Sequence, residues 1–139
     1  MDHAATMQRA YDSINVGDLE GFGALLADDF VEHEGVPGLA PTREGVIQFF
    51  TLYRAAFPDL RFTPEDILPS GDKVVSRLRV TGTHRGEFMG MPATGRSIDV
   101  QVIDIIRFGD DGLAHEHWGA FDAMTMMQQL GALPEGPPG

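Results

Sequence analysis

The sequence contains no cysteine and no long apolar run, and it has few basic residues. Without cysteine the chain has no disulfides, no thiolate nucleophile and no cysteine-bound metal. No segment approaches the roughly 18 consecutive apolar residues that a membrane span needs. With 10 Lys and Arg against 21 Asp and Glu, the net charge is −11. This charge argues against a nucleic-acid partner or an anionic membrane surface, because both require a basic protein surface.

The 139 residues, 42% hydrophobic and 22% charged, are typical of a globular protein. Residues 1–13 lack the basic and then apolar regions of a secretion signal, so we expect a cytoplasmic protein. We expect one domain over residues 1–133. The segment 134–139 is rich in proline and glycine, and we expect it to be a disordered tail.

Hydrophobic spacing divides the chain into helices followed by strands. Apolar residues at helical spacing predict helices over 7–14, 19–26 and 43–57, with Asp18 and Thr42 as N-caps and Gly17 ending the first helix. Residues 30–33 look like a short extended segment. After residue 57, alternating residues predict strands over 60–68, 73–84 and 97–108 and a last strand ending near 121, with Pro64 at an edge or a bulge. One or two helical turns follow. This order is typical of an α+β fold.

A predicted β-hairpin over residues 97–122 contains the central candidate site. If its Gly-Asp-Asp-Gly turn is symmetric, Phe108 faces Leu113 and Asp104 lies directly opposite His117, on one sheet face. A one-residue bulge at Gly112 would instead place Ile105 opposite His117 and separate the acid from the base. The residues alone leave both registers open.

The pair Asp104 and His117 suits acid–base chemistry if it lies in an apolar surrounding. A carboxylate can orient an imidazole and favour its charged form, and a positioned proton-transfer group contributes about 10²–10⁴-fold to a rate. The alternative interpretation is a buried ion pair that only fixes strand register. A metal site of His115, His117 and Asp104 is a further alternative, but no additional ligand is evident and we expect no metal.

Other polar candidates lie outside the hairpin. His33 suits a second proton-transfer group on a cavity wall, or a solvent-facing loop histidine beside Glu32 and Glu34. His84 ends the long strand, where it could contact a substrate or cap a turn. We expect His115, which is nearer the turn, to face solvent. The sequence has no glycine-rich nucleotide motif and no nucleophile elbow, so no cofactor is expected.

The substrate-binding candidates are mostly aromatic. They are Phe50, Tyr53, His84, Phe88, Met91 and Phe121. Phe50 and Tyr53 belong to the apolar stripe of the helix 43–57 and suit an ordinary core as well as a pocket. Phe88 and Met91 lie on a glycine-flanked loop, which favours a lid over a hydrophobic ligand.

The other face of the hairpin carries Trp118 with Ile103 and Ile105. Together with Val75 these residues predict an apolar outer sheet surface that a second copy of the chain would cover. We therefore expect a homodimer or homotetramer.

Three segments carry a family resemblance. They are NVGDLEGFGALLADDFVEHEG (15–35), GTHRGEFMGMPATGR (82–96) and IDIIRFGDDGLAHEHWGAFD (103–122). With the helix 43–57 they resemble the SnoaL-like polyketide cyclases and the ketosteroid isomerases. The resemblance implies a cystatin-like α+β cone, in which three N-terminal helices pack on a strongly curved, mixed, mostly antiparallel sheet that encloses a cavity. It also favours the symmetric hairpin.

The resemblance implies roles for three residues. Asp104 occupies the place of the acid that hydrogen-bonds the substrate oxyanion in ketosteroid isomerases, and His33 matches the region of their general base. His117 occupies the strand position where the cyclases carry a catalytic aspartate, paired with a histidine on the preceding strand. The two residue types are therefore exchanged in this chain.

The function implied is cofactor-independent enolate chemistry. A base would remove a proton next to a carbonyl of a hydrophobic small molecule, and the enolate would close a ring by attacking a second carbonyl. We expect His117 as the acid–base group, Asp104 as its orienting or oxyanion-stabilising partner and His33 as an auxiliary contact. An isomerase or hydrolase using the same pocket is the first alternative, and a non-catalytic small-molecule binding protein is the second.

Overall fold

The computed structural model describes residues 2–134, so the expected tail lies outside the described residues except for Pro134. The elements follow the order α1 (His3–Val16), α2 (Leu19–Gly23), β1 (Leu26–Glu32), α3 (Arg43–Ala56), β2 (Arg61–Ser70), β3 (Lys73–Thr83), β4 (Ser97–Phe108), β5 (Ala114–Phe121) and α4 (Ala123–Gln129). Within this range no helix is both long and apolar enough to cross a membrane.

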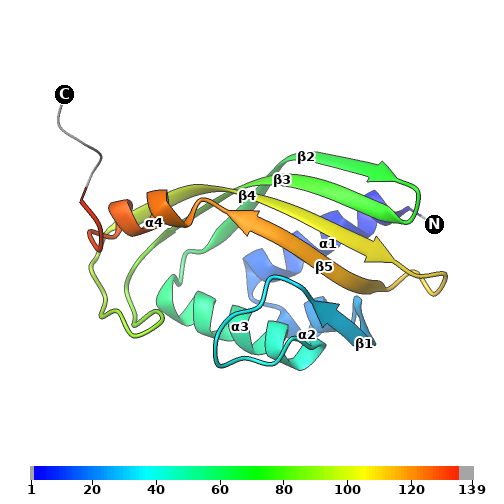
Figure 1. Cartoon of the computed structure of the whole chain (residues 1–139), viewed down its shortest axis with the longest axis horizontal. Helices are drawn as coiled ribbons and strands as arrows, with labels where there is room; N and C mark the ends of the chain where they lie inside the picture. Colours follow the sequence, from blue (N-terminus) through cyan, green and yellow to red (C-terminus); the bar gives the residue numbers. More distant parts are fainter. Residues whose placement is uncertain (1, 135–139) are drawn as a thin grey trace.

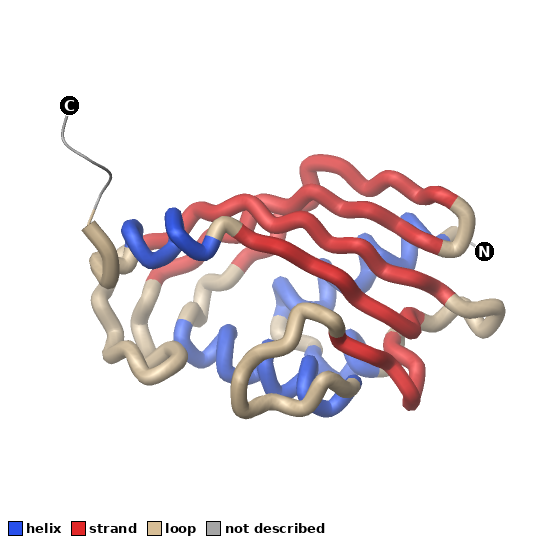
Figure 2. The backbone as a smooth tube through the Cα atoms, viewed as in Figure 1, coloured by secondary structure: helices blue, strands red, loops and turns tan. Residues whose placement is uncertain are grey.

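The five strands form one mixed sheet, mostly antiparallel, in the order β1-β5-β4-β3-β2. Only β1 runs parallel to its neighbour, β5. The three N-terminal helices lie on one side of the twisted sheet (Figures 1 and 2). The α+β class and the mixed, mostly antiparallel sheet are as the sequence predicts.

Local signals explain the helix ends. Gly17 ends α1 with a left-handed φ of 78°, and its N–H donates to the Ile14 carbonyl at 3.1 Å. The Asp18 and Thr42 side chains accept backbone hydrogen bonds that cap α2 and α3, at 2.9 and 3.3 Å. Both predicted caps are therefore confirmed.

The second helix is shorter than predicted. It ends at Gly23, and residues 26–32 form β1, so the extended segment expected over 30–33 begins earlier than predicted and ends at Glu32. The reason is tertiary: β1 pairs with β5, a strand almost 90 residues later, and buries Leu26 and Phe30. Strand pairing of this kind overrides local propensity.

The edge strand β2 contains the predicted irregularity. Its register with β3 slips between Pro64 and Asp66, so Pro64 lies at a bulge in an edge strand. Asn15, at the end of α1, bonds both backbone groups of Phe62, with Phe62 N–H donating at 2.6 Å and the Asn15 amide donating at 2.8 Å. This contact covers part of the open edge and attaches α1 to the sheet.

The symmetric hairpin register is wrong, and the alternative with a one-residue bulge holds only next to the turn. Next to the turn, Phe108 pairs with Ala114 and not with Leu113, which is a slip of one residue. His115 then has no partner across the hairpin, and from Glu116 onward the strands are offset by a second residue. Each slip places one extra residue in β5 relative to β4, as a β-bulge does.

The two slips together preserve the shared face. Asp104 lies opposite Gly119, and His117 lies opposite Ile106, so the predicted direct opposition of Asp104 and His117 is wrong. Because side chains alternate with a period of two, an offset of two residues leaves both on the same side of the sheet. They are diagonal neighbours on the face that the helices cover.

Candidate active site

A cavity of about 380 Å³ lies between the inner face of the sheet and the helices. Its walls are mainly apolar and come from all five strands, the four helices, the 34–40 segment and the loop after β3. Four of the predicted substrate-binding residues line it, namely Phe50, Tyr53, Phe88 and Phe121. The volume is within the range of small-molecule sites, about 300–1,000 Å³.

Four polar side chains of the wall, Tyr11, Asp104, His117 and Glu32, form one hydrogen-bonded network. His117 Nε2 lies 2.7 Å from Asp104 Oδ1, and His117 Nδ1 lies 2.5 Å from Glu32 Oε1. The Tyr11 hydroxyl donates to the other oxygen of Asp104 at 3.1 Å. His117, Asp104 and Glu32 are 14%, 13% and 12% exposed, so the unit is largely shielded from solvent.

The strands β1, β4 and β5 position the three charged members of this hydrogen-bonded network. Glu32 is the register partner of His117 in the parallel pair of β1 and β5, which places their side chains together. Gly119, opposite Asp104, has no side chain to occupy the diagonal between Asp104 and His117. A Cβ atom on Gly119 would lie only 2.8 Å from Cε1 and 2.9 Å from Nε2 of His117. The glycine therefore provides the space that the imidazole fills.

The imidazole of His117 holds its proton well above neutral pH. Burial alone lowers the pKa of His117, but hydrogen bonds to Asp104 and Glu32, and then the charges of these carboxylates, outweigh it and raise the pKa to about 10. At neutral pH both ring nitrogens therefore donate, one to each carboxylate. An imidazolium in this state has no lone pair with which to accept a further proton.

Glu34 is the third carboxylate of the site and, like Glu32, was not selected from the sequence. It lines the cavity, and a Cβ atom on Gly119 would lie 2.9 Å from its Oε1 atom and 2.8 Å from Cε1 of His117. Burial raises the pKa of Glu34; the positive charge of His117 lowers it, and the charges of Asp104 and Glu32 raise it further. Its surroundings therefore make Glu34 easier to protonate than an exposed glutamate.

Two tyrosine side chains also line the cavity. Burial raises the pKa of Tyr11, with a contribution from the nearby charge of Asp104, and burial also raises the pKa of Tyr53. Their hydroxyls therefore remain protonated at neutral pH; the Tyr11 hydroxyl donates to Asp104, and the Tyr53 hydroxyl is available as a hydrogen-bond donor.

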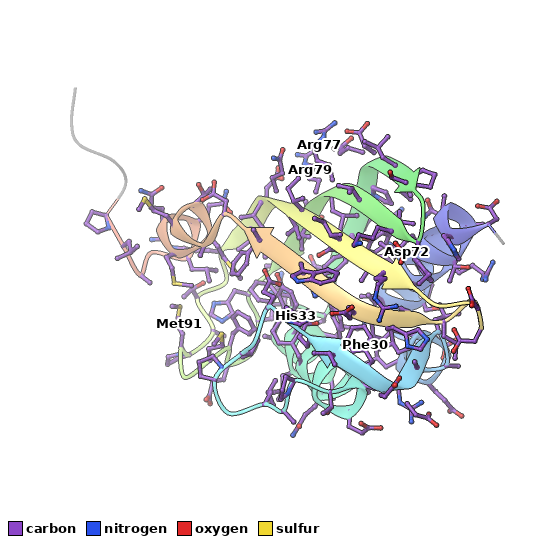
Figure 3. The ribbon with its side chains drawn as sticks, turned by 45° about the vertical axis from the view of Figure 1, so that its right-hand side comes forward. Phe30, His33, Asp72, Arg77, Arg79 and Met91 are labelled. Atoms are coloured by element: carbon purple, nitrogen blue, oxygen red, sulfur yellow. The ribbon has the colours of Figure 1, made fainter. Side chains whose placement is uncertain are left out.

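His33 does not face the cavity. Its ring stacks on Trp118 at 4.8 Å between centroids, and its Nε2 lies 2.8 Å from Glu116 Oε2, on the outer side of the sheet (Figure 3). β1 ends at Glu32, and His33 and Glu34 lie in the bend that follows; Glu32 and Glu34 line the cavity, whereas the residue between them does not. The alternation Glu-His-Glu was the available sequence signal, and extending β1 through it would have selected the two glutamates.

His84 is buried behind the cavity wall. It is fully buried, its ring stacks on Phe57 at 5.2 Å, and its Nδ1 accepts the Thr94 backbone N–H at 3.2 Å. It is not among the lining residues. The predicted substrate contact is therefore wrong, and the alternative interpretation, in which His84 fixes the loop after β3, agrees with these contacts.

In the 85–95 loop, Met89 lines the cavity in place of the predicted Met91. Phe88 and Met91 pair across a two-residue turn whose tip, Met89 and Gly90, has positive φ angles of 48° and 82°. Met89 is 66% exposed and lines the cavity, whereas Met91 packs against the core beside it. Phe88 is buried against Tyr53 at 5.1 Å. A lid movement of this loop stays a prediction.

His115, the bulged residue, lies away from the cavity. Its Nε2 contacts Asp111 at 3.0 Å and its Nδ1 contacts Asp29 at 3.4 Å, with the side chain 21% exposed. Among the residues that the structure describes, no group of three or more His, Asp or Glu side chains has an arrangement that could hold a metal ion. The suggested set of His115, His117 and Asp104 therefore does not converge.

The outer face of the sheet carries the predicted apolar residues. Leu68, Val75, Ile105 and Trp118 are register partners in one row across four strands. Leu68 is 59% exposed. Arg77 and Arg79 also lie on this side of β3 and point away from the helices (Figure 3).

The fold and the sequence both match known proteins. The structure superposes on TsrD of Streptomyces laurentii with a TM-score of 0.84, at 30% identity over 93% of this chain and 94% of that chain. IdmH of Streptomyces antibioticus, a candidate polyketide cyclase, matches with a TM-score of 0.81, at 37% identity over 94% and 99%. AclR of Streptomyces galilaeus, a candidate hydroxylase, matches with a TM-score of 0.84, at 29% identity over 98% and 85%.

No curated protein matches the sequence significantly. The family model of the SnoaL-like polyketide cyclases matches residues 5–130, which is nearly the whole described chain and includes every member of the polar unit. The chain belongs to the SnoaL-like polyketide cyclase family.

Proposed function

We propose that this protein catalyses cofactor-independent ring closure, or a closely related enolate reaction, on a hydrophobic small molecule that contains carbonyl groups. The observation that supports this proposal is the hydrogen-bonded unit of Asp104, His117 and Glu32 in the wall of an otherwise apolar cavity. Acid–base groups inside a dry enclosure interact more strongly with developing charge than they would in water.

In this proposal Asp104, and not His117, is the proton acceptor. His117 already holds protons on both nitrogens, whereas each carboxylate oxygen of Asp104 retains a lone pair beyond the one that His117 or Tyr11 occupies. Asp104 takes the proton next to a substrate carbonyl, and the electron pair of the broken C–H bond forms the enolate. His117, fixed between two carboxylates, orients Asp104 and keeps its position constant.

Ring closure then follows within the bound substrate. The enolate carbon attacks a second carbonyl carbon, which forms the C–C bond and leaves a negative charge on that carbonyl oxygen. The protonated Asp104 returns its proton to this oxygen, so that no net acid or base is consumed. The Tyr53 hydroxyl, which lines the cavity and remains protonated, is a donor available to the developing oxyanion.

An isomerase would use the same first step. It would return the proton to a different carbon of the enolate in place of carbon–carbon bond formation, and Asp104 would again be the shuttle. A hydrolase would instead direct a water molecule at the carbonyl. These reactions differ in which solvent atom enters the product: deuterium on carbon marks enolate chemistry, and solvent oxygen marks hydrolysis.

The test is deuterium exchange into a hydrophobic ketone. With 2-tetralone in D₂O, the protein should accelerate exchange of the protons next to the carbonyl, followed by proton NMR. Asp104→Asn should lower the enzyme-catalysed rate by about 10²–10⁴-fold, which is the usual contribution of a general base. Asp110→Asn, an exposed carboxylate in the β4–β5 turn, removes the same charge and should leave the rate unchanged.

Two results would contradict the proposal. Exchange by the wild type at the rate of buffer alone would show that the cavity does not activate a carbon acid. Equal exchange by the wild type and Asp104→Asn would show that the proton is taken elsewhere. Circular dichroism of the variant separates loss of chemistry from loss of the fold.

A further inference from the structure

A serine lies among the fully buried side chains on the inner face of β3. Four side chains alternate along this face and are each 0% exposed, namely Val74, Ser76, Leu78 and Val80. Three of them are apolar, as is usual at this depth. A buried hydroxyl loses its contacts with water and costs free energy unless a hydrogen bond replaces them. The serine is therefore an exception that needs a physical reason.

The position of Ser76 places it beside the proposed proton acceptor. Ser76 and Asp104 are direct register partners in the antiparallel pair of β3 and β4, so their side chains leave the same face of the sheet. Tyr11, from α1, is 3% exposed and donates to Asp104 Oδ2 at 3.1 Å. Two residues with hydroxyl groups are therefore neighbours of one carboxylate.

The hydrogen-bonding capacity of the two hydroxyls determines how they can interact. Within residues 2–134, Ser76 Oγ has no hydrogen-bond partner of ordinary geometry. The single proton of the Tyr11 hydroxyl goes to Asp104, so its oxygen can only accept from a second group. Burial and then the charge of Asp104 raise the pKa of Tyr11, whereas the Ser76 hydroxyl lowers it, which is the effect of a donor on a phenol oxygen. The free donor and the free lone pair are complementary.

We propose that Ser76 is a positioning residue of this site: its hydroxyl donates to the Tyr11 oxygen and so holds Tyr11 against Asp104. A small rotation of the Ser76 side chain completes this hydrogen bond. The inference rests on the proposed function only in the role that it gives Asp104 as proton acceptor. Ser76 is not among the residues that line the cavity, so it acts on the reaction through Tyr11 and not by contact with a ligand.

This contact has two effects on Asp104. A donor at the Tyr11 oxygen polarises the phenol and strengthens its donation to Asp104, because hydrogen bonds in a chain reinforce one another. It also restricts the Tyr11 hydroxyl, so that Asp104 Oδ2 keeps this partner while Oδ1 stays bonded to His117. The carboxylate is thus held in one orientation, as a positioned base requires.

The competing explanation is that residue 76 is small only because the Tyr11 ring needs the space. Ser76→Ala distinguishes the two explanations by the sign of its effect. If Ser76 only provides space, removal of an unpaired buried hydroxyl leaves the stability unchanged or raises it. If Ser76 bonds Tyr11, the unfolding equilibrium constant in urea experiments should rise about 5-fold, the usual effect of losing one hydrogen bond.

A double-mutant cycle with Tyr11→Phe provides the second measurement. In the Tyr11→Phe background no phenol oxygen remains, so Ser76→Ala should be neutral or stabilising, in contrast to its effect in the wild type. Ser97→Ala is the matched control, because Ser97 is an exposed serine at the start of β4. It should change the unfolding equilibrium constant by less than about 2-fold in both backgrounds.

The exchange assay with 2-tetralone measures the consequence for the reaction. Ser76→Ala should lower kcat for exchange by about 5-fold, leave KM unchanged, and have no further effect in Tyr11→Phe. The inference is overturned if Ser76→Ala is at least as stable as the wild type, if its effect on stability is the same in Tyr11→Phe, or if it exchanges at the wild-type rate. If the wild type itself does not exchange, the proposed function fails, and the urea cycle still decides whether Ser76 bonds Tyr11.

Discussion

Gly119→Ala tests whether the hydrogen-bonded network around His117 depends on the missing side chain at position 119 of β5. Alanine is a better strand residue than glycine by about 0.5–1 kcal/mol, and Gly119 has an ordinary negative φ, so local propensity alone predicts stabilisation. The structure predicts the opposite sign. A methyl group on Gly119 would lie 2.8 Å from His117 Cε1, against an ordinary contact of 3.4 Å or more.

The imidazole would have to move by about half an ångström, and the Glu34 carboxyl group, 2.9 Å from the same point, limits the direction. This displacement weakens the 2.7 Å contact between His117 Nε2 and Asp104. A charge-assisted hydrogen bond of this kind contributes about 1.5–3 kcal/mol. After the gain in propensity, the expected net loss of unfolding free energy is about 1–2 kcal/mol.

Urea denaturation of the wild type and Gly119→Ala measures this difference. Gly35→Ala is the control, because a Cβ atom on Gly35 has no neighbour within 4 Å, and it should change stability by less than about 0.5 kcal/mol. If Gly119→Ala is as stable as the wild type and the ring resonances of His117 are unchanged, the argument that Gly119 provides space for the imidazole is wrong.

Three further predictions concern the charges and the outer face. The unfolding free energy of the wild type should fall as pH rises from 6.5 towards 10, because the folded state keeps the His117 proton that the unfolded chain loses; the slope from this group is at most about 1.4 kcal/mol per pH unit, and His117→Gln should remove it. Glu32→Gln should lower the pKa of His117 and destabilise the protein by about 1–3 kcal/mol in urea at neutral pH, because a buried imidazolium loses one of its two carboxylates; an unchanged midpoint would contradict this. We propose that a second copy covers the outer row of Leu68, Val75, Ile105 and Trp118, so light scattering should give a dimer or tetramer for the wild type and a monomer for Ile105→Lys; a monomeric wild type would rule this interface out.

Local patterns were sufficient for the features that depend on neighbouring residues. Asp18 and Thr42 cap helices because a side-chain oxygen reaches an N–H group three residues away, and the change from helical to alternating spacing after residue 57 gives the α+β order. The edge position of β2 followed from Pro64, which cannot donate to a sheet.

Features that depend on distant pairing could not be obtained in this way. The hairpin register results from two slips, and the second one, at His115, has no distinct local signal. Asp104 and His117 still share one face of the sheet because the two slips add up to an offset of two residues, which is the period of side-chain alternation. The parallel pairing of β1 with β5, which places Glu32 beside His117, joins distant parts of the chain, and no local pattern indicates it.

The roles within the site also required the structure. The sequence brought one acid and one base together, and this suggested a histidine that moves a proton. The second carboxylate, Glu32, changes that interpretation, because a histidine between two carboxylates retains its proton. The residue most able to accept a proton from a substrate is then Asp104.

The most direct test of this account is the protonation state of His117, followed by ¹⁵N and ¹H NMR of its ring as a function of pH. The account predicts that both ring nitrogens carry protons at neutral pH and that the midpoint of titration is near 10. A midpoint at or below 6.5, with one neutral tautomer at neutral pH, would contradict it and return the proton-accepting role to the histidine.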